Sequence, residues 1–291
     1  MKTAKIISFL LALAALTACS RQENGSSQAS SSRSYSQRGK ASVKKTSKQV
    51  EMISYQTTYR GKAYTKQAEV YLPADYDKNQ KHNVIYLVHG STEVSGGRST
   101  LMEDGNFVSL LNQLDEGGQL KGTIVVFPTY YPSSSSVKSD YYADRPLNER
   151  FAREEFVQDL MPAVESHYKT YAQNISRGAL EASRAHRAFG GFSMGAITSW
   201  YAFQYDLPYV SSFLPMAGDA WNVTSDGSSS RPEATAALLA KAAEKDGEDF
   251  KILAGVGTGD PTGGSMEPQI SAMYRLKAFN KQNLRYYQQA G

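Results

Sequence analysis

The sequence predicts an α/β fold in which a mainly parallel sheet is covered by helices on both faces. Short apolar runs alternate along the chain with longer stretches of helical periodicity, which is the order of elements in such a fold. Two of the runs, residues 83–88 and 123–127, are almost continuously β-branched or aromatic, as expected of strands buried on both faces. With 291 residues and 41% hydrophobic content, the chain can form one full-sized domain beside an N-terminal segment.

The N-terminus has the pattern of an export signal. A positive segment, residues 1–5, precedes an apolar stretch, residues 6–16, which is too short for a comfortable membrane span. It ends in Leu16-Thr17-Ala18-Cys19, which resembles the lipobox of bacterial lipoproteins. The resemblance implies a protein lipid-anchored through Cys19 to the membrane at the bacterial cell surface, outside the cytoplasm. The alternative is an ordinary signal peptide with an unmodified cysteine.

The segment after the signal is polar and basic. Residues 20–48 are rich in Ser, Gln and Lys and have too few apolar side chains to offset the entropy of ordering. We therefore expect a signal peptide over 1–18, a flexible tether over 19–49 and a folded domain over 50–291. The tether is a solvated spacer, or its basic run contacts an anionic surface.

Charge and cysteine content exclude several classes of protein. Residues 51–291 carry 23 basic and 27 acidic side chains, so the folded part is net negative and a nucleic-acid partner is not expected. The single cysteine allows no disulfide within the chain. No metal-binding His/Cys motif occurs in the sequence. The dinucleotide-binding fingerprint is incomplete, because Asp260 stands where its third glycine is required. We expect no metal and no cofactor.

The first half of the domain contains three predicted strands and two predicted helical regions. Strands are predicted at 68–72, 83–88 and 123–127. Apolar residues recur on one face of 106–116, and Gly117-Gly118 ends this helix. Residues 148–171 follow a mostly helical period that Pro162 is expected to kink. A Ser-rich loop precedes this region, where a substrate-binding loop would lie.

The second half repeats the strand–helix alternation. Strands are predicted at 187–192, 209–216, 250–256 and 284–289. Helices are predicted at 194–205, 234–245 and 266–279.

A glycine-flanked serine lies where strand 187–192 meets helix 194–205. Gly191-Phe192-Ser193-Met194-Gly195 fits the G-x-S-x-G of a nucleophile elbow, a sharp strand-to-helix turn that exposes the serine hydroxyl. The motif alone is common by chance, so its surroundings have to support the assignment. Strand 83–88 is followed by the loop His89-Gly90-Ser91. In folds of this kind, the loop at this place supplies one N–H of the oxyanion hole, which we assign to Ser91.

A serine nucleophile needs a carboxylate and a histidine farther along the chain. Asp219 follows the first strand after the elbow and Asp260 follows the second, within a Gly-rich turn. We prefer Asp260, because the acid usually follows the second strand, and Asp219 is then a carboxylate that caps its loop.

Several segments together carry a family resemblance. They are Val-Ile-Tyr-Leu-Val-His-Gly at 84–90, Asp-Leu-Met-Pro-Ala-Val-Glu at 159–165, Gly-Gly-Phe-Ser-Met-Gly at 190–195, Pro-Met-Ala-Gly-Asp-Ala-Trp at 215–221, Gly-Thr-Gly-Asp at 257–260 and Met-Glu-Pro-Gln-Ile at 266–270. Over roughly residues 50–291 the chain resembles the family 1 carbohydrate esterases, which include feruloyl and acetylxylan esterases and lie close to the esterase D group. The resemblance implies an α/β-hydrolase fold and a substrate that is an acyl ester linked to plant polysaccharide.

The resemblance also implies roles for individual residues. Ser193 is the nucleophile and Asp260 the acid. Met194 and Ser91 are the oxyanion N–H donors, and Trp221 and Tyr130 line the site of an aromatic acyl group. For both aromatic residues, ordinary packing is an equally good interpretation.

The sequence departs from the family pattern at the catalytic histidine. The family carries it in a turn after the last strand, whereas here that strand reaches Gly291. All four histidines precede Ser193, at positions 82, 89, 167 and 186. We therefore expect a C-terminally incomplete chain without its general base. The alternatives to an active esterase are a catalytically impaired carbohydrate-binding lipoprotein and an acyltransferase to a sugar acceptor.

Overall fold

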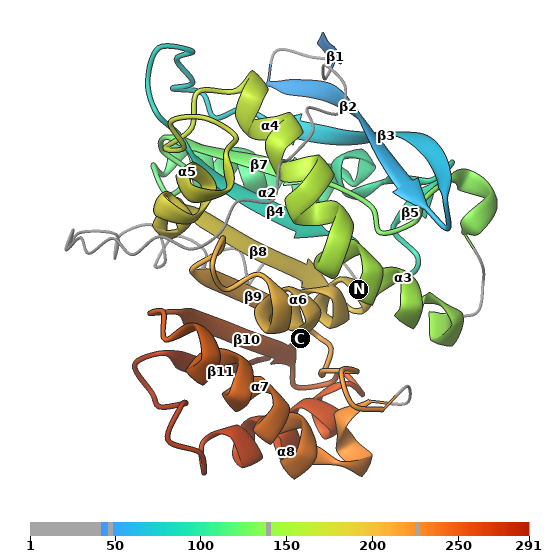
Figure 1. The fold of residues 1–291 in the computed structure, drawn as a ribbon, viewed down its shortest axis with the longest axis vertical. Helices are drawn as coiled ribbons and strands as arrows, with labels where there is room; N and C mark the ends of the chain where they lie inside the picture. Colours follow the sequence, from blue (N-terminus) through green and yellow to red (C-terminus); the bar gives the residue numbers. More distant parts are fainter. Residues whose placement is uncertain (1–41, 46–48, 138–140, 225–226, 291) are drawn as a thin grey trace.

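The computed structural model describes residues 42–45, 49–137, 141–224 and 227–290. The predicted fold class is confirmed, since a nine-stranded sheet has the order β1-β2-β3-β7-β4-β8-β9-β10-β11 (Figure 1). The six strands from β7 to β11 in this order are mutually parallel, while β1, β2 and β3 are antiparallel to their neighbours. Two short strands, β5 (Val94–Ser95) and β6 (Arg98–Ser99), form a separate hairpin. The sheet consists of β1 (Ser42–Lys45), β2 (Val50–Tyr59), β3 (Lys62–Tyr71), β4 (Asn83–Val88), β7 (Thr123–Phe127), β8 (Arg187–Phe192), β9 (Ser212–Met216), β10 (Lys251–Gly257) and β11 (Leu284–Gln289).

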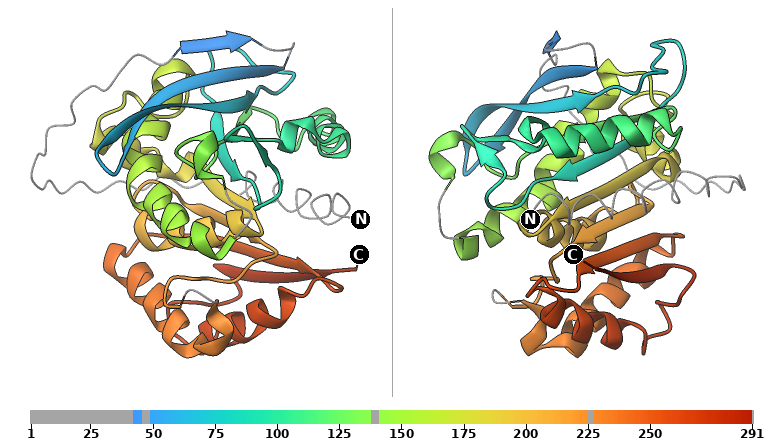
Figure 2. Two further views of the ribbon diagram at one scale, coloured as in Figure 1. Left: turned by 90° about the vertical axis from the view of Figure 1, so that its right-hand side faces the viewer. Right: turned by 180° about the vertical axis from the view of Figure 1, so that it is seen from behind.

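Helices cover both faces of the sheet. In Figure 1 the helices α4 and α6 lie in front of the sheet, and the view from behind in Figure 2 shows α2 across the opposite face. The helical segments are α2 (Gly105–Glu116), α3 (Arg145–Arg150), α4 (Met161–His167), α5 (Arg177–Ala182), α6 (Met194–Tyr205), α7 (Pro232–Asp246), α8 (Gly263–Met273) and the π-helical η4 (Phe151–Leu160); short 3-10 turns are η1 (Leu101–Glu103), η2 (Ser134–Ser136), η3 (Tyr141–Asp144), η5 (Arg184–His186) and η6 (Ser228–Ser230).

The apolar runs in the sequence are explained by burial on both sides. In β4, Val84 and Tyr86 pack into the core under α4 and α6, while Ile85 and Leu87 pack into the core under α2. Successive side chains of a strand point to opposite faces, so a strand between two helical layers needs apolar residues at every position. The amphipathic helix α2 contributes Phe107, Leu110, Leu111 and Leu114 to its core, as its periodicity predicts.

The chain reverses its direction of travel across the sheet between β4 and β8. From β4 the chain continues to β7 on one side, then returns to β8 on the other side and proceeds outward through β9, β10 and β11. In open parallel sheets, ligands bind beyond the carboxyl ends of the strands at such a switch point. The loops that follow β4 and β8 therefore form the expected site.

Two segments differ from their predicted structure. Strand β1 pairs with β2 inside the predicted tether 19–49, so that prediction is wrong for residues 42–45. A polar segment can join an exposed sheet edge through backbone hydrogen bonds alone, which apolar content does not reveal. The predicted helix 148–171 is instead α3, η4 and α4 in succession, ending at His167. Pro162 cannot donate a backbone hydrogen bond and lies in the first turn of α4, directly after the π-helical segment.

Candidate active site

One edge of the sheet holds the predicted site residues. Because β4, β7, β8, β9 and β10 are parallel, their carboxyl ends meet at this edge. Ser91 follows β4, Tyr130 follows β7, Ser193 follows β8, Asp219 and Trp221 follow β9, and Asp260 follows β10.

Ser193 occupies a sharp turn between β8 and α6. Its backbone has φ 55° and ψ −114°, a conformation that residues other than glycine rarely adopt. The Ser193 N–H donates a 2.9 Å hydrogen bond to the Met216 carbonyl oxygen, which ties the turn to the adjacent strand β9. Ser193 is half-buried, and this strained strand-to-helix turn is the geometry of a nucleophile elbow.

Neighbouring glycines permit this turn. A Cβ atom on Gly195 would overlap the carbonyl oxygen of Val88, and one on Gly191 would overlap the Gly195 backbone. A Cβ atom on Gly218 would lie 2.7 Å from the carbonyl oxygen of Ser193. The loop after β9 and the end of β4 thus approach the elbow so closely that only glycine fits.

The elbow also creates a binding site for negative charge. Met194 begins the twelve-residue helix α6, and N–H groups in the first turn of a helix lack acceptors within the helix. These N–H groups and the helix dipole favour an anion at this end. The Met194 N–H belongs to this first turn, directly after Ser193.

His89 supports the loop that carries Ser91. His89 is fully buried, with its Nδ1 atom 2.5 Å from the Gly90 carbonyl oxygen and its Nε2 atom 2.8 Å from the Thr129 hydroxyl. Burial, and then the nearby Lys66 charge, lower the pKa of His89 to about 4 despite the opposing hydrogen bond to Gly90. His89 is accordingly a neutral structural residue at this edge at pH 7.

The two candidate acids are held differently. Asp219 is buried, and its Oδ2 accepts hydrogen bonds from the Ser228 N–H and, at 2.8 Å, from the Ser228 hydroxyl. Asp260 is half-buried, and its Oδ1 accepts from the Thr262 N–H at 3.0 Å and the Thr262 hydroxyl at 2.7 Å. Asp219 thus closes its own loop, as predicted for a capping carboxylate, while Asp260 lies in the turn before α8.

The two predicted acyl-binding aromatics are both buried. Trp221 is 7% exposed, and Tyr142, which is 53% exposed, stacks on it with ring centroids 5.4 Å apart. Tyr130 has no exposed surface and stacks on His89 at 4.9 Å. Trp221 therefore borders the surface through Tyr142, whereas Tyr130 packs beneath the loop that carries Ser91.

The four histidines of the sequence all lie within the described residues. His82 precedes β4 and His186 precedes β8, at the edge opposite Ser193, because the six residues of β8 span about 20 Å. His167 ends α4 near Thr170, which bridges to His82. His89 lies at the same edge of the sheet as Ser193, but its two ring nitrogens are hydrogen-bonded to the Gly90 carbonyl oxygen and the Thr129 hydroxyl. None of the four is placed to deprotonate Ser193.

The model of the Esterase family matches residues 65–290. The chain belongs to this family. The esterase is 37% identical over 229 residues to endo-1,4-beta-xylanase Y of Acetivibrio thermocellus; the match covers 77% of the chain but only 19% of that much longer relative.

Solved structures agree with this assignment. The esterase is 29% identical to a structure described as FAE, with a TM-score of 0.70 and 89% of each chain covered. It is also 29% identical to a mutant of the feruloyl esterase module from Clostridium thermocellum complexed with sinapinate, with a TM-score of 0.67 and 89% of each chain covered. A ferulic acid esterase from Anaeromyces mucronatus shares the fold at 19% identity, with a TM-score of 0.56 and 89% of this chain and 86% of that chain covered. The family model and the relatives at 29–37% identity support assignment to the family 1 carbohydrate esterases.

Two predictions concern groups outside this site. Cys19 lies outside the described residues, so its lipidation stays a prediction. Among the residues that the structure does describe, no helix is long and apolar enough to cross a membrane. Within that same part of the chain, no group of three or more His, Cys, Asp and Glu side chains could hold a metal ion.

Sequence reasoning missed a buried charged cluster near this edge. Lys66 contacts Glu155, which also accepts hydrogen bonds from Tyr55 and Arg150. The alternation of side chains along β3 could have revealed the cluster, because Lys66 lies on the same face of the strand as the buried Ala68 and Val70. A lysine on the inward face of a strand requires a buried partner.

Proposed function

We propose that this esterase cleaves feruloyl or acetyl esters of plant polysaccharide through an acyl-enzyme on Ser193. The observation that carries the proposal is the strained backbone of Ser193, at φ 55°, between β8 and the N-terminus of α6. Backbone strain of this kind persists only where the surrounding structure imposes it, and it is common at catalytic residues.

The proposed reaction has two steps. The Ser193 Oγ attacks the ester carbonyl carbon as a base takes the hydroxyl proton, and the resulting oxyanion accepts hydrogen bonds from the Met194 and Ser91 N–H groups. Collapse of the tetrahedral intermediate expels the sugar alkoxide, which takes up the proton. Water then attacks the acyl group, and Ser193 regains its hydroxyl when the carboxylic acid leaves. Asp260 is the proposed acid that orients the base.

Of the two proposed acyl groups, the aromatic rings near the sheet edge favour the feruloyl group. Trp221 lies two residues beyond Asp219 at the sheet edge, and its ring is in contact with the exposed Tyr142. Flat aromatic rings bind a planar hydroxycinnamoyl group through stacking and apolar contact. The similarity to a feruloyl esterase module complexed with sinapinate supports this choice of substrate.

Hydrolysis of methyl ferulate and of acetylated xylan tests the proposal. We expect the Ser193→Ala variant to lose activity on both substrates with its fold intact, which circular dichroism would verify. Activity that survives in this variant would rule out Ser193 as the nucleophile. Analysis of the products in the presence of a sugar acceptor separates hydrolysis from acyl transfer.

A second candidate function is supported by the positions of the histidines. Without a base beside Ser193, these 291 residues would show only the residual rate of the oxyanion hole and substrate binding, roughly 10³- to 10⁴-fold over water. The chain would then act as a carbohydrate-binding protein. Xylan-oligosaccharide binding measured by calorimetry without any acyl release would favour this function over catalysis.

We also propose that the mature protein is lipid-anchored through Cys19 outside the cytoplasm. The support comes from the sequence, in which a positive segment, a short apolar stretch and Leu16-Thr17-Ala18-Cys19 occur in the order of a lipoprotein signal. Such an anchor would hold the esterase at the cell surface, where polysaccharide is accessible.

A further inference from the structure

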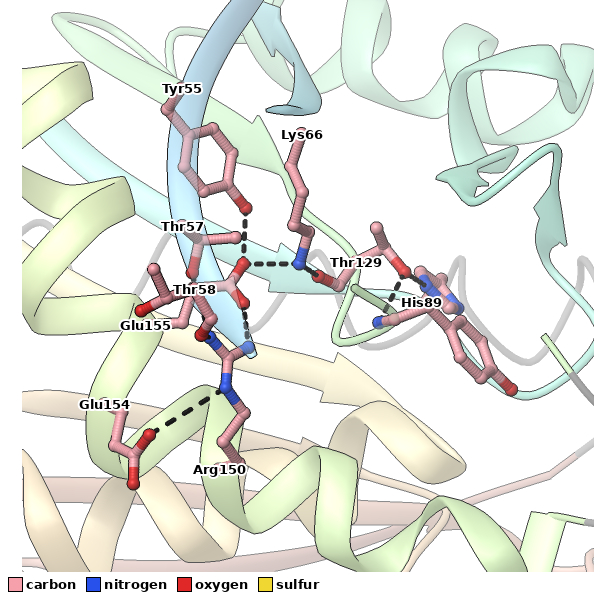
Figure 3. Close-up of polar contacts among 10 residues, drawn as sticks. Tyr55, Thr57, Thr58, Lys66, His89, Thr129, Arg150, Glu154 and Glu155 are labelled. Carbon is pink, nitrogen blue, oxygen red and sulfur yellow. Dashed lines mark hydrogen bonds and ion pairs between the residues drawn. The ribbon is translucent and has the colours of Figure 1, made fainter. Parts of the chain in front are cut away.

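Glu155 is the centre of a buried charged cluster, which we define as Tyr55, Lys66, Arg150 and Glu155. Glu155 lies in the π-helical segment η4 and has no exposed surface. Its Oε1 accepts hydrogen bonds from the Tyr55 hydroxyl, at 2.7 Å, and from Lys66 Nζ, while its Oε2 accepts from Arg150 (Figure 3). Withdrawing these charges from water is costly, so the cluster is not explained by stability alone.

Lys66 connects this cluster to the oxyanion loop. Its Nζ also donates a 2.6 Å hydrogen bond to the Thr129 carbonyl oxygen. The Thr129 hydroxyl lies 2.8 Å from Nε2 of His89, and Nδ1 of His89 contacts the Gly90 carbonyl oxygen. Figure 3 shows the contacts from Glu155 through Lys66 and Thr129 to His89. A continuous path of buried polar contacts thus runs from η4 to the loop after β4.

The chemistry of the partners determines which atom donates each hydrogen bond. The Gly90 carbonyl oxygen can only accept, so His89 Nδ1 carries the proton. Because burial and Lys66 keep His89 neutral at pH 7, its Nε2 has no proton and accepts from the Thr129 hydroxyl. The Thr129 hydroxyl oxygen in turn accepts a 3.2 Å hydrogen bond from the Tyr131 N–H. His89 is therefore held in its Nδ1–H tautomer.

The hydrogen bond to Gly90 sets the direction of the Ser91 N–H. The carbonyl of Gly90 and the N–H of Ser91 belong to the same peptide unit, and no cis peptide bond occurs in the described residues. In a planar trans peptide these two groups point in opposite directions. When His89 holds the Gly90 carbonyl, the Ser91 N–H must point away from the His89 ring.

We propose that Lys66 and Glu155 act through Thr129 and His89 as positioning residues that orient the Gly90–Ser91 peptide for oxyanion binding. The inference rests on the proposed function, in which the Ser91 N–H is an oxyanion donor. Preorganised donors contribute to catalysis only when their direction is set before the reaction. A buried ion pair anchored on η4 supplies this rigidity from outside the site.

The Thr129→Val variant tests the path from Lys66 to His89 at the single hydrogen bond between Thr129 and His89. It removes the hydroxyl that His89 Nε2 needs and leaves the Lys66 contact to the Thr129 backbone carbonyl intact. We expect kcat on 4-nitrophenyl acetate to fall about 10- to 100-fold with KM nearly unchanged, since loss of one oxyanion donor costs about 10²- to 10³-fold. The Thr129→Ser variant, which keeps the hydroxyl, should recover most of the rate.

Thr57→Val is the matched control. Thr57 is also a buried threonine, and its hydroxyl accepts a 2.9 Å hydrogen bond from Arg150 at the far end of the charged cluster, but no described hydrogen bond joins it directly to Thr129 or His89. We expect Thr57→Val to lower the thermal unfolding midpoint about as much as Thr129→Val does, with kcat unchanged. Equal kcat values for the two valine variants would overturn the proposal.

The paired substitution of Lys66→Met with Glu155→Gln tests the charged end of the path. It removes the Lys66 and Glu155 charges together, while Arg150 keeps its contacts with Glu154 and Thr57. We expect the same loss of kcat as in Thr129→Val, and little further loss when the two changes are combined, because both interrupt one path. If the combined variant instead loses the full kcat reduction of each change multiplied together, the charged cluster does not act through Thr129.

The tautomer of His89 gives a readout that needs no activity. Nitrogen-15 NMR of the wild-type protein, assigned by comparison with His89→Asn, should show a protonated Nδ1 and an unprotonated Nε2. Thr129→Val should shift the Nε2 signal, and Thr57→Val should not. An Nε2–H tautomer in the wild type would contradict the path. If Ser193→Ala hydrolyses esters normally, the proposed function fails, yet this experiment still decides whether His89 is held as described.

Discussion

His89 illustrates how burial sets the properties of a single residue. Its ring is fully enclosed, stacks on Tyr130 at 4.9 Å and is hydrogen-bonded at both nitrogens. The cost of burying a charge, together with the Lys66 ammonium, lowers its pKa from 6.5 to about 4. A histidine in this state supports its neighbours and does not exchange protons near neutral pH.

This lowered pKa predicts how stability depends on pH. The unfolded chain protonates His89 near pH 6.5, whereas the folded chain resists protonation until about pH 4. The His89 contribution is therefore complete above pH 6.5 and is lost as the pH falls from 6.5 to 4, by up to about 3 kcal/mol. Urea unfolding of wild type and His89→Asn across this range measures it. We expect the wild type to lose more stability than the variant, and parallel curves would contradict the buried neutral state.

Among individual residues, those that belong to a sequence motif could be predicted, whereas the buried residues that support them could not. Ser193, Ser91 and Asp260 were predicted from motifs that follow three of the strands, and the structure places them just beyond the carboxyl ends of the parallel strands β8, β4 and β10. The partner of Lys66 could not be predicted, because Glu155 is 89 residues away and comes from a segment that was expected to be an ordinary helix.

The elbow is the element with the least tolerance for change. Strand β8, helix α6 and the end of β4 meet at Gly195, where any added carbon would overlap the Val88 carbonyl oxygen and lie 2.9 Å from that of His89. Neither neighbour can move easily, because both belong to the backbone at the end of β4.

Gly195→Ala should therefore destabilise the esterase by roughly 1–3 kcal/mol, as overpacking does in a dense core, and displace the elbow. Gly264 in α8 is the control, because a Cβ atom there would meet no atom within 4 Å and its φ is not positive. Gly264→Ala should stabilise the protein by up to about 1 kcal/mol through helix propensity. Thermal unfolding measures both variants, and equal shifts would contradict this account of the elbow.

Most elements were predictable because burial leaves a periodic pattern. Strands β4, β7, β8 and β11 were predicted with the bounds that they have in the structure. The breaks in the predicted helix 148–171 were not found, since η4 keeps nearly helical spacing while changing its hydrogen-bond pattern. Strand β9 begins at Ser212 rather than 209, because a turn joins Tyr209 to Asp206.

At the scale of the molecule, the reversal of strand order at β4 and β8 builds the site. This order places the oxyanion loop and the elbow on adjacent strands, and it places both acid candidates on the outward side of Ser193. The topology thus explains why residues that are far apart in sequence serve one edge. The proposed role of the segment before residue 42 is attachment.

A Cys19→Ala variant tests this attachment. Without the thiol, the chain cannot receive the thioether-linked lipid, so we expect the protein to move from the membrane fraction to the soluble fraction while its esterase domain stays folded. Cell fractionation with incorporation of labelled palmitate measures the change. If Cys19→Ala stays in the membrane fraction and the wild type takes up no label, the lipoprotein proposal is wrong.

The central claim is that Ser193 carries the acyl group, and intact-protein mass spectrometry tests it most directly. An activated ester, 4-nitrophenyl ferulate, should acylate Ser193, and quenching the reaction in acid should preserve the adduct for detection. We predict one added feruloyl group, located by peptide mapping to the peptide that contains Ser193 and missing from Ser193→Ala. An adduct that persists in Ser193→Ala, or one that maps to another residue, would contradict the claim.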